Sequence, residues 1–179
     1  MKGILSLLLI ASTLMIPALA RADNNQYNDP AMSFTAPPDF QQTPVPSHDP
    51  ASFDDPTVVA AFMKNPGQRN AMQIVVRMQN FSGDASAFEL NVENDLRNST
   101  NDFFIKKTET KLPNGMPAYW QEITVGSGFD TMKVFEYVWV DGLRGVQLSI
   151  SSRGGSLDEP TAKRALANVS AVAYPRNRY

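Results

Sequence analysis

The sequence predicts an α+β fold in which an antiparallel β-sheet is flanked by two amphipathic helices. Several stretches alternate apolar and polar residues, which is the period of a half-buried strand. Two other stretches, 82–100 and 157–173, repeat apolar residues every three or four positions, as amphipathic helices do. The pairs Asn114-Gly115 and Asp141-Gly142 are typical of tight hairpin turns between antiparallel strands.

Residues 1–22 have the layout of a cleaved signal peptide. A single lysine precedes a short apolar run, and small residues follow at Ala18, Ala20 and Ala22. Cleavage after Ala22 leaves a single domain, 23–179, and cleavage after Ala20 is the alternative. No second long apolar run follows, so we expect no membrane span in the mature chain. The chain has no cysteine, so its exported form must be held together by its core rather than by disulfides.

The first part of the mature chain is acidic and rich in proline. Residues 23–55 contain six Asp and no Lys or Arg, and seven of the 13 prolines lie at positions 30–56. Proline donates no backbone hydrogen bond, so we expect 41–56 to form an extended loop outside any sheet. Without residues 1–22 the chain carries 14 basic and 18 acidic side chains. This net charge excludes nucleic acid as an expected partner.

The first half of the domain is predicted to hold three strands and a helix. The strands are 31–37, 57–64 and 71–79, and the last of these places Gln73, Arg77 and Gln79 on its polar face. In the helix at 82–100, Ser86 and Glu89 form the expected capping box. Its apolar face consists of Ala85, Phe88, Val92 and Leu96.

The second half is predicted to be an antiparallel meander followed by a helix. Strands at 103–112 and 118–125 flank the Asn114-Gly115 turn, and a bend at 126–128 leads into the next hairpin. The closing helix, 157–173, has Pro160 in its first turn. Its apolar face is Ala162, Ala165, Leu166, Val169, Val172 and Ala173.

The stretch "VFEYVWVDGLRGVQLSIS" (134–151) places three aromatic residues at alternate positions before Asp141-Gly142. A two-residue turn at Asp141-Gly142 would pair Val140 with Leu143 and fix the register of the hairpin. One face then carries Phe135, Tyr137, Val146, Leu148 and Ile150, with Trp139 at the rim. We predict that this stripe is core and not a platform for a ligand.

The histidine and its acidic neighbours offer one candidate metal site. His48 is the only histidine, and Asp49, Asp54 and Asp55 lie close to it in sequence. These side chains could bind a hard metal ion or remain a solvated polar loop, and the lack of a rigid support favours the loop. A single histidine excludes a multi-histidine metal site.

Two glutamates offer a second candidate site. If neighbouring strands pair even positions with even, Glu122 and Glu136 face each other, and two facing carboxylates can share a proton or bind a cation. The alternative is a pair of solvated glutamates on a half-exposed sheet.

The order of elements and several local motifs resemble the PsbP-like family. The motifs are "FTAPPDF" (34–40), "GMPAYW" (115–120), "VDGLRGVQLSIS" (140–151) and "ALANVSAV" (165–172). The resemblance implies an α/β/α sandwich, no cofactor, and a binding or assembly role in place of an enzymatic one. The family includes a lumenal subunit of photosystem II and many exported bacterial proteins, among them DcrB-like ones.

We therefore expect an exported, non-enzymatic binding or accessory protein of the cell envelope. It would be periplasmic or extracellular, or lie in the thylakoid lumen if the organism is photosynthetic. We expect a protein partner whose basic patch is contacted by Asp49, Asp54 and Asp55. The alternatives are a small-ligand or metal-binding carrier and an enzyme that uses Glu122 or Glu136. The sequence leaves the oligomeric state open.

The leader prediction can be checked by mass. We expect the exported protein to begin at Asp23, because Ala20 and Ala22 occupy the two small-residue positions before that bond. The intact mass of protein purified from the exported fraction measures this directly. A mass that still includes residues 1–22 would contradict it.

Overall fold

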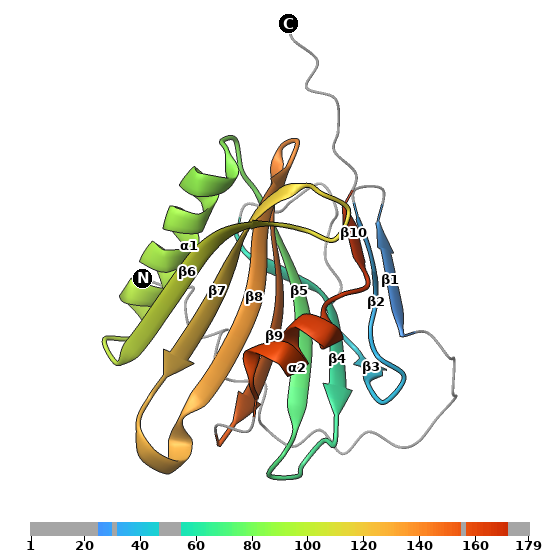
Figure 1. The fold of residues 1–179 in the computed structure, drawn as a ribbon, viewed down its shortest axis with the longest axis vertical. Helices are drawn as coiled ribbons and strands as arrows, with labels where there is room; N and C mark the ends of the chain where they lie inside the picture. The colour runs from blue at the N-terminus through green and yellow to red at the C-terminus, as the bar shows by residue number, and fades with distance from the viewer. Residues whose placement is uncertain (1–24, 30–31, 47–54, 155–156, 172–179) are drawn as a thin grey trace, which may run out of the picture.

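Two antiparallel sheets make up most of the computed structural model, which describes residues 25–29, 32–46, 55–154 and 157–171 (Figure 1). The large sheet has seven strands in the order β3 (Gln41–Thr43), β4 (Thr57–Lys64), β5 (Met72–Asn80), β9 (Arg144–Arg153), β8 (Met132–Asp141), β7 (Pro117–Val125) and β6 (Phe103–Lys111). The small sheet has the order β1 (Gln26–Asp29), β2 (Met32–Thr35) and β10 (Val169–Ala171). The helices are α1 (Ala85–Ser99) and α2 (Glu159–Ala165), and a 3₁₀ turn covers Gly128–Asp130.

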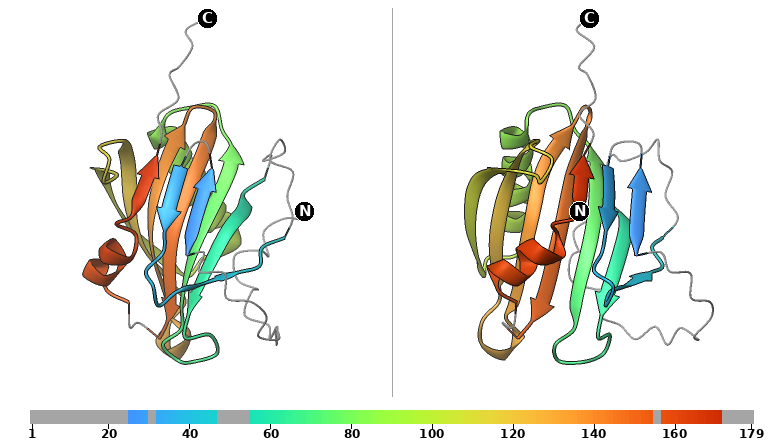
Figure 2. Two further views of the ribbon diagram at one scale, coloured as in Figure 1. Left: turned by 90° about the vertical axis from the view of Figure 1, so that its right-hand side faces the viewer. Right: turned by 45° about the vertical axis from the view of Figure 1, so that its right-hand side comes forward.

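The main core lies between the large sheet and a layer formed by the small sheet and α2 (Figure 2). We call this side of the large sheet its inner face. Side chains from both layers fill the space, and their largest fully buried members include Trp139, Phe34, Phe62, Phe135, Ile74, Leu148 and Ile150. Phe34 of the small sheet meets Phe62 of the large one edge to face, with ring centroids 5.7 Å apart.

Helix α1 covers part of the opposite, outer face of the large sheet (Figure 2). Phe88 and Val92 pack against Val138 of β8 in a second, smaller core, and Tyr119 and Val140 are partly buried beside them. None of the described helices is both long and apolar enough to cross a bilayer.

The predicted α/β/α sandwich is therefore wrong. A helix covers part of the outer face, but a second β-sheet with a short helix covers most of the inner one. The error lies in 157–173, where the helix ends at Ala165, a turn follows, and β10 then pairs with β2. Val169 and Ala171 are buried and Ser170 is exposed, which is strand alternation within a segment that also fits a helical period.

The helix caps also differ in part from the sequence prediction. The Asp84 side chain caps α1 by accepting a hydrogen bond from the Ala87 amide at 2.8 Å. Glu89 is not part of a capping box, because it is buried against the sheet. Pro160 does lie in the first turn of α2, as predicted, with Asp158 as its cap.

The predicted loop 41–56 begins with a strand. Gln41–Thr43 forms β3, which pairs with β4 at the edge of the large sheet, so the first three residues contradict a loop. The prolines that follow are consistent with an edge position. Residues 47–54, which include His48, Asp49 and Asp54, lie outside the described residues.

The aromatic hairpin forms with a register different from the predicted one. Asp141 pairs with Arg144, so the two-residue loop is Gly142-Leu143, and Tyr137 faces Leu148 in place of Val146. Gly142 has φ 61°, which glycine adopts without strain. The observed pairing differs from the predicted one by an even number of residues, so each side chain stays on its predicted face of the sheet. The aromatic stripe is core, as predicted. Trp139, expected at the rim, is fully buried.

Gly145 of β9 allows α1 to pack closely against the large sheet. A Cβ atom at this position would lie 2.2 Å from Cε2 of Phe88, a distance that real side chains do not show. The Phe88 ring lies in this space and also contacts the Phe81 ring, with centroids 4.9 Å apart. The absence of a side chain at residue 145 therefore fixes how closely the helix approaches the sheet.

We expect Gly145→Ala to lower the free energy of unfolding by about 1–3 kcal/mol, because the new methyl group overlaps a buried ring. Denaturant unfolding of the variant measures this. Phe88→Leu and the variant with both substitutions complete a double-mutant cycle. The smaller leucine at position 88 should reduce the loss of stability caused by Gly145→Ala. Strictly additive costs would contradict a direct contact.

Candidate functional site

A row of polar side chains crosses the outer face of the large sheet at right angles to its strands. Lys107 of β6 pairs with Gln121 of β7, Gln121 with Glu136 of β8, and Glu136 with Ser149 of β9. We call these four residues the polar row. Each occupies an outward position, which the alternation of the strand places opposite the core.

Helix α1 is tied to the polar row through two acidic side chains. Lys107 Nζ donates to Glu89 Oε2 at 3.0 Å and to Glu93 Oε2 at 2.8 Å, and Gln121 Nε2 donates to Glu89 Oε1 at 2.9 Å. Arg97 also binds Glu93. Hydrogen bonds from Lys107 and Arg97 lower the pKa of Glu93, and those to Glu93 and Glu89 raise the pKa of Lys107. These buried carboxylates therefore dock the helix.

Glu136 is the most unusual member of the polar row. Its side chain is buried, with 4% of the residue exposed, and its Oε1 has no hydrogen-bond partner among the described residues. Burial raises its pKa from 4.5 to about 7, although the nearby Arg77 lowers it, while Glu89 raises it further. The Oε1 atom of its strand partner Gln121 is also buried without a partner among the described residues. A protonated Glu136 can donate a hydrogen bond to that oxygen, whereas a carboxylate cannot.

The predicted pairing of Glu136 with Glu122 does not occur. The register places Glu136 opposite Gln121 and Glu122 opposite Phe135, so odd positions pair with even ones. The two carboxylates consequently lie on opposite faces of the sheet. Glu122 is partly exposed, with Oε1 3.9 Å from Lys133 Nζ. These glutamates cannot share a proton or a cation.

The candidate metal ligands find no support among the described residues. No group of three or more His, Cys, Asp or Glu side chains within the described ranges is arranged to hold a metal ion. His48, Asp49 and Asp54 lie outside these ranges, and Asp55 is exposed. The metal prediction for this loop stays a prediction.

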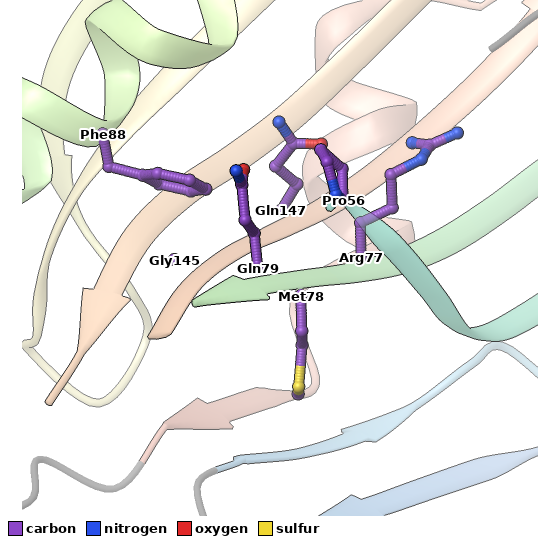
Figure 3. A pocket seen from close by; sticks show the side chains of 7 residues that line it. All are labelled: Pro56, Arg77, Met78, Gln79, Phe88, Gly145 and Gln147. Carbon is purple, nitrogen blue, oxygen red and sulfur yellow. The ribbon is translucent and has the colours of Figure 1, made fainter. Parts of the chain in front are cut away.

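Beside α1 the outer face has a shallow depression that opens to solvent and has no room for an enclosed water molecule. Figure 3 shows the side chains of Arg77, Gln79 and Gln147 on the same side of the sheet as Phe88, with Met78 on the opposite side. The Phe88 ring fills the space above Gly145. The complete lining is Pro56, Arg77, Met78, Gln79, Phe88, Gly145 and Gln147.

Arg77 carries the only formal charge among the described residues that line this depression. Its guanidinium makes no hydrogen bond or ion pair with another described residue. Burial lowers its pKa, and the field of Glu136 opposes that change. The sequence placed Arg77 on a polar strand face but gave no hint of the depression, because α1, β9 and Pro56 are distant in sequence. An arginine in the middle of a strand was the one available signal.

A second ionic group joins the two sheets at the far end of the hairpin. Arg144 lies 3.0 Å from Asp29 of the small sheet and 3.6 Å from Asp141 across the turn. Asp141 is fully buried, and burial raises its pKa. This group holds β1 against the hairpin.

Comparisons with known proteins add no functional information. No family model and no curated protein matches the chain. Its fold is similar to that of a protein from Bacteroides thetaiotaomicron VPI-5482 with a crystal structure at 1.50 Å resolution, with a TM-score of 0.48 and 11% identity. The alignment covers 82% of this chain and 48% of the other, so the chain spans about half the length of that protein. The resemblance to the PsbP-like family gains no support.

Stability should depend on the protonation of Glu136. Its pKa is higher in the folded state, at about 7, than in the unfolded chain, so folding retains a proton. The free energy of unfolding should then fall as pH rises from about 4.5 to about 7, by at most about 3 kcal/mol, and level off above that range. Glu136→Gln should remove this part of the slope and be more stable than the parent above pH 7.

Denaturant unfolding at a series of pH values measures the effect. Glu122→Gln is the matched control, because it makes the same change in a partly exposed glutamate on the inner face of the sheet. An identical pH dependence in Glu136→Gln and the parent would contradict the assignment.

Proposed function

We propose that the protein is an exported, non-enzymatic binding protein of the cell envelope that contacts its partner through the outer face of the large sheet beside α1. The observation that carries this proposal is the different extent to which the two faces of the large sheet are covered. The inner face is filled by the small sheet, α2 and their side chains, whereas α1 covers only part of the outer face.

The uncovered part of the outer face has the character of a contact surface. Arg77, Gln79 and Gln147 are half-buried polar groups next to Phe88, which is packed in place by Gly145 and Phe81. Protein interfaces are enriched in arginine and carry polar groups around their centre. Phe88 is 1% exposed, so it supports this surface from beneath and does not itself contact a partner. Rigid strands and a docked helix hold these groups in position, which lowers the entropic cost of binding.

This arrangement favours surface recognition over the alternatives. A small-ligand carrier would need a cavity, and the space between sheet and α2 is packed with fully buried side chains. An enzyme based on Glu122 and Glu136 would need both carboxylates at one place, and they lie on opposite faces.

The acidic segment supplies a second element of the proposal. Asp55 is exposed and precedes Pro56, which lines the depression. Together with Asp49 and Asp54, which lie outside the described residues, it would attract a basic patch on the partner. Partner recognition through these three aspartates stays a prediction.

Site-specific photo-crosslinking in cells that make the protein naturally tests the proposal. With p-benzoylphenylalanine in place of Gln79 or Gln147, we expect a discrete covalent adduct with an envelope protein after irradiation. The same group in place of Thr108, exposed on β6 and directed to the inner side, is the control and should give no such adduct. Adducts of equal yield at Thr108, or none at Gln79 and Gln147, would contradict an outer-face contact.

A further inference from the structure

We propose that the side-chain amide of Gln121 is a two-position switch, set by the proton on Glu136, that controls the attachment of α1 to the large sheet. In one position the amide nitrogen binds the helix through Glu89. In the other position it binds an ionised Glu136, and the helix is released. This inference goes beyond the proposed function and does not depend on a partner. It is carried by the buried contacts between the polar row and α1.

Gln121 of β7 lies within reach of both the helix and Glu136. Its side chain is fully buried, and its Nε2 donates to Glu89 Oε1 at 2.9 Å. Across the ladder between β7 and β8, Gln121 is paired directly with Glu136. Paired side chains on one face of a sheet have Cβ atoms about 4.5–5.5 Å apart, so their polar ends can meet. One amide therefore connects the helix with the carboxyl group of the neighbouring strand.

The observed position of the amide requires a proton on Glu136. Gln121 Oε1 and Glu136 Oε1 are both buried without a hydrogen-bond partner among the described residues. Two acceptors side by side repel each other, whereas one proton between them satisfies both. Burial raises the pKa of Glu136 to about 7, so the proton is retained in weakly acidic solution. The amide nitrogen then remains available to Glu89.

Ionisation of Glu136 favours the other position of the amide. A buried carboxylate needs donors, and the Gln121 amide supplies one if its nitrogen and oxygen exchange places. Its oxygen then points to the Glu89 carboxylate, and the hydrogen bond to the helix is lost. On the opposite side of Glu136, the Ser149 hydroxyl already donates to the Val75 carbonyl oxygen at 3.4 Å.

The charged groups around Glu136 in the described part of the chain oppose a docked helix once Glu136 is ionised. They are Glu89, Glu93 and Arg97 of α1, Lys107 of β6 and Arg77 of β5. Glu89 raises the pKa of Glu136 and Arg77 lowers it. An ionised Glu136 adds a negative charge beside Glu89, whose ion-pair partner Lys107 is shared with Glu93. The attachment of α1 should therefore weaken as the pH rises through about 7.

Thiol labelling tests this inference directly, because the chain has no native cysteine. Val138 of β8 is fully buried beneath α1, so the thiol of Val138→Cys reacts with a reagent such as DTNB only when the helix opens. Leu90→Cys, on the exposed side of the same helix, corrects for the pH dependence of the thiol itself. We expect the ratio of the two rates to rise at least about tenfold between about pH 5 and about pH 8.

Three controls assign this rise. Glu136→Gln should abolish it, because a neutral amide at position 136 can donate to Gln121 Oε1 at every pH. Glu122→Gln makes the same change on the opposite face of the sheet and should leave the rise intact. Val146→Cys places the same thiol in the main core, which only global unfolding exposes, so it should react much more slowly than Val138→Cys.

NMR on the protein without substitutions gives a second measurement. The side-chain NH₂ signals of Gln121 should shift with a midpoint near pH 7, in step with the loss of the Glu136 proton.

Three results would overturn the inference. Equal rates for Val138→Cys and Val146→Cys would show that α1 does not open separately. A rise that persists in Glu136→Gln and disappears in His48→Gln would assign the pH response to the single histidine, which titrates in the same range. Gln121 NH₂ signals that do not change with pH would show that the amide keeps one position.

Discussion

The outer face depends on the attachment of α1 to the large sheet. Two interactions of opposite character hold the helix there. The Phe88 ring lies in the space left by Gly145, and Lys107 bridges Glu89 and Glu93. The glutamates are buried, so removal of the lysine would leave Glu89 without an ion-pair partner and Glu93 with Arg97 alone. The apolar contact sets the distance of the helix, and the ionic contact sets its position along the strands.

The large sheet separates its functions by face. On each central strand one set of alternate residues builds the core with the small sheet, and the other set builds the polar row and the wall of the depression. A shift of the hairpin by one residue would exchange the two sets and bury Glu136 in the main core. The actual register differs from the predicted one by an even number, and for this reason the faces agree although the pairs do not.

Sequence reasoning located what depends on local pattern. It found most strands, the apolar face of α1 and the buried aromatic stripe, because period and turn residues are encoded within short stretches. It missed the strand at Val169–Ala171, where pairing with β2 overrides a segment that fits either period. It also missed the inward direction of Glu89, because the lysine that makes this burial tolerable is 18 positions away. The depression at Arg77 could not be predicted either, because its lining residues come from separate segments of the chain.

The position of Lys107 on the outermost strand gives the α1 attachment a further consequence. β6 ends the large sheet, and its nine residues are mostly exposed. A free strand edge is a template on which another polypeptide can add, and lysines along it oppose such growth. Because Lys107 is held by two glutamates of α1, the helix also fixes the border of the sheet. Detachment of α1 would release that border and uncover Val138 of β8, two strands further into the sheet. Partial unfolding at this helix would therefore offer a second copy of the chain both a free strand edge and an apolar surface.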